Sequence, residues 1–505
     1  MKRCAFVFLI ALIFWRTNII ASAVGMPGEA EELTDQATIE CTNSAVLTDG
    51  DETTYTKVTD GDSVIIRSDT GISSMYVIFD RIYGEWMLSD GAEDVICGKN
   101  DFLHEYINIT EIFGDSPKML TLTFSGHDCF LSELHIFGDG EVPMWVQQWE
   151  PPCEEADLML TSTHIDDEQL FFAGILPYYA GECGLAVQVV YFTDPFTYHD
   201  RPHEQLNGLW TVGVRNYPVS GEFMDAYSEN AEDAYAHQRE VGFEQEDMVR
   251  FQVEMIRRFR PHVVVGHDIN GEYGHGQHMI NCETLMEALE LASDSSYDPD
   301  SVLAYGVWNT PKTYIHLWEE NPVVMDWDKP LEAFGGKTAF QVSQEGFLCH
   351  QSQQWTWFNR WIFGKNGEIT KASEIKTYSP CFYGLYRTNV GLDRTGGDMF
   401  ENIPQSYAEI EAEEIRRQEE AVAERERTSS VETKKEENPP DFGQKEPQEE
   451  DHARRNSSEI TDTEPAGVDS TGETKAGICI GIIIVAAVVT ALSMVYMMLR
   501  HRRNQ

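Results

Sequence analysis

The chain has 505 residues and a formal net charge of −48, from 37 basic against 85 acidic residues. A field of this sign repels phosphate, which argues against nucleic acid as a partner and leaves neutral or cationic substrates such as amino sugars open. Hydrophobic residues make up 42% and aromatic residues 11%. That is enough for packed cores, and the length predicts two folded units with accessory segments.

The first 23 residues predict a secretory signal peptide. Lys2 and Arg3 precede an apolar run, and Ala21-Ser-Ala23 has the small side chains of a cleavage site. An uncleaved anchor is the less favoured interpretation, because the apolar run is short for a bilayer.

Residues 36–140 predict an all-β jelly-roll sandwich, because short β-rich runs alternate with Gly, Asp, Asn and Ser turns. We expect strands at Ser63–Arg67, Ser74–Asp80, Leu120–Phe124 and Leu131–Phe137. The segments Leu47–Tyr55 and Leu131–Gly138 resemble the first and last signatures of discoidin-like, galactose-binding-like domains. The resemblance implies either a sugar-binding module or a spacer, and both interpretations stay open.

Residues 155–403 predict an α/β domain with a mainly parallel sheet. Strands are expected at Leu158–Thr163, Leu185–Phe192 and His262–Gly266, and helices at Asp167–Tyr178 and Glu246–Phe259. In such sheets the working residues follow the carboxyl ends of strands. Two polar clusters stand in that position.

The first cluster is His164-Ile-Asp-Asp-Glu168. From a tight turn, His164 and Asp167 could bind one ion, and Asp166 could take a proton from bound water. Taken alone, the cluster fits a solvated acidic turn better. The second cluster, Gly266–His278, adds three histidines, a tyrosine and a glycine-rich loop. Paired with the first, it completes a ligand set.

Together the two clusters resemble the PIG-L, or LmbE-like, family of zinc-dependent N-acetylglucosaminyl deacetylases. That family carries HPDDE after its first strand and a GxYGHxxH-type element later. The resemblance implies a Rossmann-like fold and hydrolysis of an N-acetyl group from an amino sugar. It also implies three zinc ligands, namely His164, Asp167 and His278. Asp166 would be the general base, Tyr273 would steady the oxyanion, and His275 would protonate the leaving amine.

Two positions depart from the family pattern. Ile165 replaces a proline, and Gln277 stands where some members have an aspartate that tunes the acid histidine. The role of His275 therefore stays open unless Asp268 or Glu272 supplies a carboxylate.

Other candidates are weaker. Arg201 begins an Arg-x-x-Glu helix that matches the family, and Arg201 and Asp268 are candidate substrate contacts, with a surface salt bridge as the alternative for Arg201. His104-Glu and His203-Glu begin like HExxH metalloprotease helices, but each lacks the second histidine. The aromatic stretch Trp355–Trp361 suits either a sugar pocket or a buried core.

The end of the chain predicts a membrane anchor. Residues 404–475 are acidic and polar, typical of a disordered stalk, and residues 476–499 are uncharged and mostly apolar. The basic tail 500–505 follows, so we expect one transmembrane helix with a cytoplasmic tail. The prediction is a single-pass type I membrane protein at the cell surface or in the secretory lumen.

That compartment is oxidising, so the even number of cysteines in the outer segment favours disulfide bonds. Asn108 and Asn456 are possible glycosylation acceptors. The eight cysteines are Cys41, Cys97, Cys129, Cys153, Cys183, Cys282, Cys349 and Cys381.

The sequence thus predicts a zinc-dependent hydrolase that removes N-acetyl groups from N-acetylglucosamine-type amino sugars or glycans on the luminal side. Two alternatives stay open. One is a catalytically silent carbohydrate-binding surface protein, and the other is a deacylase of a different N-acyl substrate.

Overall fold

The computed structural model describes residues 28–417, 420 and 422. The predicted signal peptide, transmembrane helix, cytoplasmic tail and most of the stalk lie outside these residues. The start of the stalk is helical at 407–417. Within the described ranges, no helix is long and apolar enough to cross a membrane.

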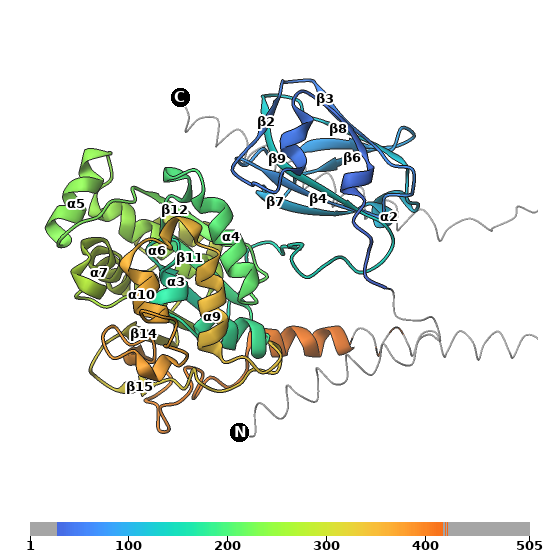
Figure 1. The fold of residues 1–505 in the computed structure, drawn as a ribbon. Helices are drawn as coiled ribbons and strands as arrows, with labels where there is room; N and C mark the ends of the chain where they lie inside the picture. The colour runs from blue at the N-terminus through green and yellow to red at the C-terminus, as the bar shows by residue number, and fades with distance from the viewer. Residues whose placement is uncertain (1–27, 418–419, 421, 423–505) are drawn as a thin grey trace, which may run out of the picture. The chain divides into compact units, whose positions relative to one another are not determined.

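The N-terminal domain is a β-sandwich of two antiparallel sheets (Figure 1). One sheet has the order β1-β3-β8-β5-β6, with strands Thr38–Glu40, Ser63–Arg67, Met119–Thr123, Trp86–Ser89 and Asp94–Cys97. The other has the order β2-β9-β4-β7, with strands Thr56–Val58, Cys129–Phe137, Ser74–Phe79 and His104–Asn108. The short elements η1 (Thr34–Gln36), η2 (Ser44–Thr48) and α2 (Ile109–Phe113) fill the connections.

The four strands expected from the sequence form β3, β4, β8 and β9. Strand β4 is buried on both faces. Met75 and Val77 pack into the sandwich core, whereas Tyr76 and Ile78 pack against the segment that leads into the next domain. Strands β6 and β7 were not expected, because their polar residues hide the alternation that identifies a strand.

The second domain is built on a seven-stranded sheet of order β12-β11-β10-β13-β14-β16-β15. The first five are parallel, β16 runs antiparallel to β14, and β15 runs antiparallel to β16. In sheet order the strands are Val219–Phe223, Val187–Thr193, Leu158–Ser162, Val263–Gly266, Lys312–His316, Phe382–Thr388 and Pro322–Val324. The parallel part has the doubly wound, Rossmann-like order.

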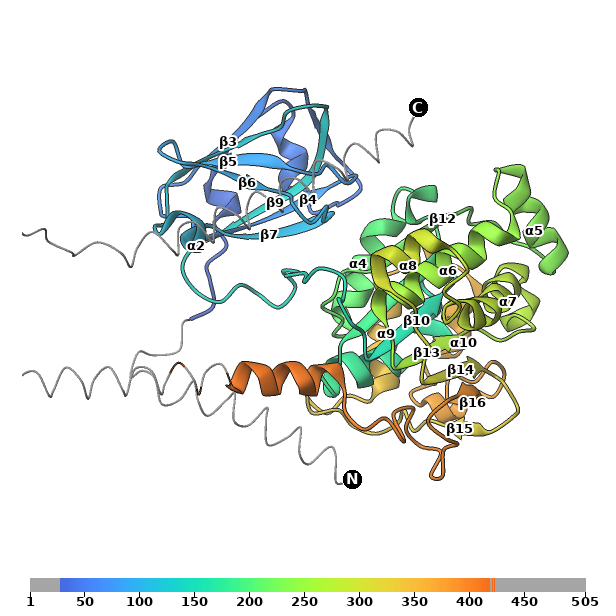
Figure 2. The same cartoon turned by 180° about the vertical axis from the view of Figure 1, so that it is seen from behind.

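Helices cover both faces of this sheet (Figure 2). Alternate residues of a strand point to opposite faces, so Leu160 joins the core with α4 (Arg201–Thr211) and α9 (Ala339–Leu348). Met159 packs on the other face with α6 (Gln245–Phe259) and α7 (Gly276–Leu291). The remaining elements are α3 (Asp167–Leu170), α5 (Ala231–Glu240), α8 (Pro299–Tyr305), α10 (Trp357–Phe363), η3 (Pro177–Glu182), η4 (Pro195–Thr197), η5 (Glu272–Gly274), η6 (Gln351–Gln353) and η7 (Ala372–Glu374).

The helix predicted at Asp167–Tyr178 is wrong in its length. Regular α-helix stops after Leu170, and a π-helical turn, η3, follows from Pro177. Gly174 has φ of 99°, and a Cβ there would lie 2.4 Å from the ring of Trp327. The close approach of this ring requires the left-handed glycine, which interrupts the helix.

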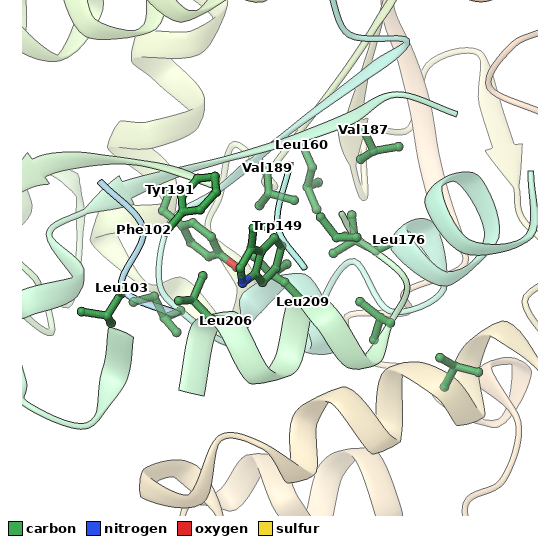
Figure 3. Close-up of a cluster of buried hydrophobic side chains, with 14 of the residues drawn as sticks. Phe102, Leu103, Trp149, Leu160, Leu176, Val187, Val189, Tyr191, Leu206 and Leu209 are labelled. Carbon is green, nitrogen blue, oxygen red and sulfur yellow. The ribbon is translucent and has the colours of Figure 1, made fainter. Parts of the chain in front are cut away.

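The sandwich and the α/β domain share buried side chains. Figure 3 shows Phe102 and Leu103, from the loop before β7, beside Trp149 and the α4 side chains Leu206 and Leu209. These residues belong to one continuous apolar cluster. The loop before β7 is therefore fixed against α4 by packing.

The expectation of disulfide bonds is wrong for seven of the cysteines, which are free thiols. Cys97 and Cys153 are buried, and burial raises the pKa of each thiol to about 12. Such side chains behave as small apolar core residues rather than as crosslinks. The seven are Cys41, Cys97, Cys129, Cys153, Cys282, Cys349 and Cys381.

Leu160→Ala tests the role of strand β10 as the centre of the core. Leu160 is 0% exposed, so we expect the free energy of unfolding to fall by about 2–5 kcal/mol, measured by urea denaturation. Leu303→Ala on α8 is the matched control, since Leu303 is 88% exposed and its loss should change stability by less than about 0.5 kcal/mol. Equal effects of the two changes would contradict the assignment.

Candidate active site

The two polar clusters meet at the carboxyl end of the sheet. Strands β10 and β13 are adjacent and parallel, but the chain continues from β10 to β11 on one side and from β13 to β14 on the other. Open α/β sheets bind ligands in the crevice where the strand order reverses in this way. Residues 164–168 follow β10, and residues 267–278 follow β13.

Three predicted ligands form a triangle of nitrogen and oxygen atoms. His164 Nδ1 lies 3.2 Å from Asp167 Oδ2 and 3.1 Å from His278 Nε2, and the last two atoms are 3.3 Å apart. In a tetrahedral site with bonds of about 2.0 Å, ligand atoms lie about 3.3 Å from one another. All three side chains are buried. The triangle therefore fits a divalent metal ion with one position left for water or substrate.

Gln277 orients the first ligand. Its Nε2 donates to the carbonyl of Met224 at 2.5 Å, and its Oε1 accepts the backbone N–H of Ala226 at 3.0 Å, which fixes the amide. The same Oε1 lies 2.8 Å from His164 Nε2, so that nitrogen carries the proton and donates it. The lone pair of His164 is left on Nδ1, the atom of the triangle.

Glu272 orients the second histidine ligand and its surroundings. Its Oε2 lies 2.7 Å from Nδ1 of His278 and 2.9 Å from Nδ1 of His267. Its Oε1 lies 2.6 Å from Nδ1 of His316 and accepts the backbone N–H of Asp268 at 3.2 Å. Four donors thus surround one carboxylate that is 0% exposed. Burial opposes its charge, but the three histidines hold its pKa well below the usual value.

This arrangement prepares His278 for a cation. With its Nδ1 proton held by Glu272, its Nε2 faces Asp167. Burial disfavours the charged ring, yet Asp167 and Glu272 raise the pKa of His278 to about 10. The position favours positive charge, and a divalent cation would replace the Nε2 proton.

His267 is a positioning residue rather than a fourth ligand. Its Nε2 lies 3.5 Å from Asp167 Oδ2, but it accepts the backbone N–H of Thr163 at 3.0 Å. Its Nδ1 faces Glu272, so both nitrogens are used within the protein.

Asp166 lies beside the triangle in a strained conformation. Its φ is 133°, outside the usual range of a non-glycine residue, and its backbone N–H donates to Glu168 Oε2 at 3.0 Å. Its Oδ2 lies 3.7 Å from Nη2 of Arg201. Burial raises the pKa of Asp166 well above its usual value, and the Arg201 guanidinium opposes that rise.

The alternative of a surface salt bridge for Arg201 is wrong. Only 5% of the residue is exposed, and its Nη2 donates to the carbonyl of Ile165. The guanidinium therefore ties α4 to the turn that carries Asp166. A direct substrate contact by Arg201 stays a prediction.

Tyr273, the predicted oxyanion residue, lies in η5, and His275, the predicted acid, follows it. His275 caps α7, and its Nδ1 accepts the backbone N–H of Gln277 at 3.1 Å, so the ring proton lies on Nε2. Its ring stacks on His278 with centroids 4.8 Å apart. Burial, Asp167 and Asp166 raise the pKa of Tyr273, which keeps its hydroxyl protonated.

Asp268 and Glu272, the two carboxylates that the sequence offered as partners of His275, bind other groups in the structure. Asp268 Oδ1 accepts both the backbone and the side-chain N–H of Asn270 at 3.1 Å, as part of a local turn. Glu272 is used by His267, His278 and His316. A substrate contact by Asp268 stays a prediction.

Sequence reasoning missed the positioning roles of Glu272 and Gln277. It treated Gln277 as the loss of a carboxylate and Glu272 as its possible replacement. Glu272 precedes the motif tyrosine in a histidine-rich loop, which was the available signal. Its three partners, however, come from two parts of the chain that only the sheet brings together.

Aromatic rings line one side of the site. Tyr273 contacts Trp357 and Phe358, with ring centroids 5.4 and 5.7 Å apart, and Phe171 lies 5.4 Å from Trp361. Trp357 is 46% exposed. It therefore forms an open wall next to Tyr273 rather than a buried core.

No family model matches this chain. It is 30% identical over 146 residues to 1D-myo-inositol 2-acetamido-2-deoxy-alpha-D-glucopyranoside deacetylase 2 of Saccharopolyspora erythraea. The matched region is 29% of this chain and 43% of that enzyme, so the chain spans less than half the length of this curated relative.

Two solved structures show weaker likeness. The N,N'-diacetylchitobiose deacetylase of Pyrococcus horikoshii is 16% identical at a TM-score of 0.32, over 46% of this chain and 85% of that one. CpGH89CBM32-6, produced by Clostridium perfringens, is 17% identical at a TM-score of 0.17, over 21% of this chain and 98% of that one. Likenesses this low carry no argument about function.

Gln277→Leu should weaken binding of a divalent metal ion about 10- to 100-fold, because His164 loses the acceptor that fixes its tautomer. The measurement is metal affinity by competition with a chromophoric chelator. Gln341→Leu, on α9 and outside the site, is the matched control. Unchanged affinity of the Gln277 variant would refute the positioning role.

Proposed function

We propose that this protein is a zinc-dependent amide hydrolase that removes N-acetyl groups from N-acetylglucosamine-type sugars or glycans. The observation that carries the proposal is the triangle of His164 Nδ1, Asp167 Oδ2 and His278 Nε2, spaced at 3.1–3.3 Å. Two imidazoles and one carboxylate with an open position are a donor set of catalytic zinc. Deacetylation of an acetamido sugar is the named activity of the Saccharopolyspora relative.

Zinc held by the triangle would supply Lewis acidity, activating a water molecule and polarising the amide carbonyl. Asp166 is placed to take the proton from that water as it attacks. Burial raises the pKa of Asp166, and Arg201, 3.7 Å away, opposes the rise, so the Asp166 carboxylate is a stronger base than an exposed aspartate.

Two neighbouring groups suit the later proton transfers. The hydroxyl of Tyr273, kept protonated by its buried setting, can donate to the oxyanion of the tetrahedral intermediate. The Nε2–H of the neutral His275 ring can donate a hydrogen bond to the amide nitrogen. The proton that Asp166 takes from water can pass to that nitrogen as the C–N bond breaks, so that an amine and acetate leave.

We also propose that the site lies on the luminal or extracellular side of the membrane. This part of the proposal rests on residues 1–23 and 476–499, whose composition predicts a signal peptide and one anchor. A lumenal or surface site would meet glycans, and the sandwich is proposed to present them. The aromatic wall of Trp357 suits the apolar face of a sugar ring, and an N-acyl lipid is the competing substrate class.

Asp166→Asn should lower acetate release from N-acetylglucosamine oligomers by about 10²- to 10⁴-fold and leave bound zinc unchanged, because it removes a base and no ligand. Acetate is measured by a coupled assay and zinc by mass spectrometry. Asp300→Asn, exposed on α8, is the control. Full activity of the Asp166 variant would refute the base assignment. A wild type that binds no zinc and releases no acetate would refute the whole proposal.

Trp357→Ala should raise KM about two- to tenfold with kcat and zinc content unchanged, since packing of one ring contributes about 0.5–1.5 kcal/mol. Steady-state kinetics on chitooligosaccharides and on an N-acyl lipid would separate the two substrate classes. Trp355→Ala is the control, because Trp355 is 83% exposed. Unchanged KM for both substrates would remove the aromatic wall from the proposal.

A further inference from the structure

A second cluster of metal-ligating groups lies where the sandwich meets the α/β domain. It consists of Glu52 from the loop after η2, His104 from β7 and His203 from α4. One ligand atom from each lies within 4.8 Å of the others. His104 and His203 are 0% and 2% exposed. None of the three belongs to the site of the proposed hydrolase.

The proton positions around His104 follow from Trp149, because an indole N–H can donate a hydrogen bond but cannot accept one. Trp149 Nε1–H donates to Gln147 Oε1 at 2.8 Å, which identifies that atom as the amide oxygen. His104 Nδ1 lies 3.1 Å from the same oxygen, so it carries the ring proton. The lone pair of His104 is therefore on Nε2, which lies 2.8 Å from His203 Nδ1.

The same chain of hydrogen bonds fixes the carboxylate. Gln147 Nε2 donates to Asn207 Oδ1 at 2.6 Å, so Asn207 Nδ2 donates to Glu52 Oε2 at 2.8 Å. Outer groups that hold a ring proton away from the metal and orient a carboxylate are characteristic of metal sites. Here they orient His104 and Glu52 without any ligand from the catalytic triangle.

The cluster is not satisfied by protein groups alone. His203 Nε2 is buried and has no hydrogen-bond partner among the described residues. A buried ring nitrogen without a partner is a polar group that a bound ion would satisfy.

We propose that Glu52, His104 and His203 form a second zinc site that joins the sandwich to helix α4. Two imidazoles and a carboxylate suit zinc, and ligand atoms of a tetrahedral ion lie about 3.3 Å apart. Glu52 stands in a loop between η2 and β2, so it can close on an ion. Because α4 also carries Arg201, the ion would hold the end of α4 that contacts the turn of Asp166.

The test is the zinc content of the purified full-length chain in detergent, measured by mass spectrometry after dialysis against micromolar zinc. Wild type should hold two ions per chain. Glu52→Gln and His203→Gln should each hold one, His278→Gln should hold one, and Glu52→Gln with His278→Gln should hold none. His199→Gln is the matched control, since His199 lies at the same junction but donates to the Thr53 carbonyl, and it should keep two.

Glu52→Gln keeps the shape of a partly exposed loop side chain, so we expect this variant to fold. A variant of a buried histidine carries a greater risk of misfolding. X-ray absorption on zinc-loaded His278→Gln gives a second measurement, with two imidazoles and one carboxylate expected. If the wild type holds one zinc ion and both Glu52→Gln and His203→Gln retain it, this proposal is overturned. If the wild type holds one zinc ion that Glu52→Gln loses and His278→Gln keeps, this proposal is supported and the proposed catalytic site is refuted instead.

Discussion

The candidate site depends on one buried carboxylate. Glu272 accepts from His267, His278, His316 and the backbone of Asp268, which fills the acceptor positions of both its oxygens. His316 Nε2 also lies 3.0 Å from the carbonyl of Ser379, so each of its ring nitrogens faces an acceptor. A buried carboxylate is stable only when it is paired and hydrogen-bonded in this way.

This carboxylate connects the sheet to the metal triangle. His316 is the last residue of β14, and His278 lies in the first turn of α7. By holding the Nδ1 proton of His278, Glu272 leaves Nε2 for the proposed metal ion. Loss of Glu272 would free two elements at once, because His267 and His278 share one of its oxygens.

Helix α4 plays a comparable role on the other side of the site. Arg201 binds the Ile165 carbonyl and approaches Asp166, whereas Glu204 accepts the hydroxyl of Ser352 at 2.7 Å. Two residues after Arg201, His203 meets His104 of the sandwich. One helix therefore links the proposed base to the domain junction. This placement connects the sandwich physically to the turn that carries the proposed base.

The sequence by itself predicted the class of the second domain and the two halves of the candidate site. Buried strands followed at once by His164–Glu168 and Gly266–His278 predicted that these two segments meet, since both signals are local. Strands β3, β4, β8 and β9 were predicted for the same reason: each carries its own apolar alternation.

Only the tertiary structure decided how the side chains are used. Gln277 orients His164 rather than tuning His275, and Glu272 serves three histidines, because partners distant in sequence meet at the end of the sheet. The break after Leu170 came from the ring of Trp327, which no local pattern contains. The free thiols and the meeting of His104 with His203 likewise follow from packing between elements, which a single sequence does not encode in its local periodicity.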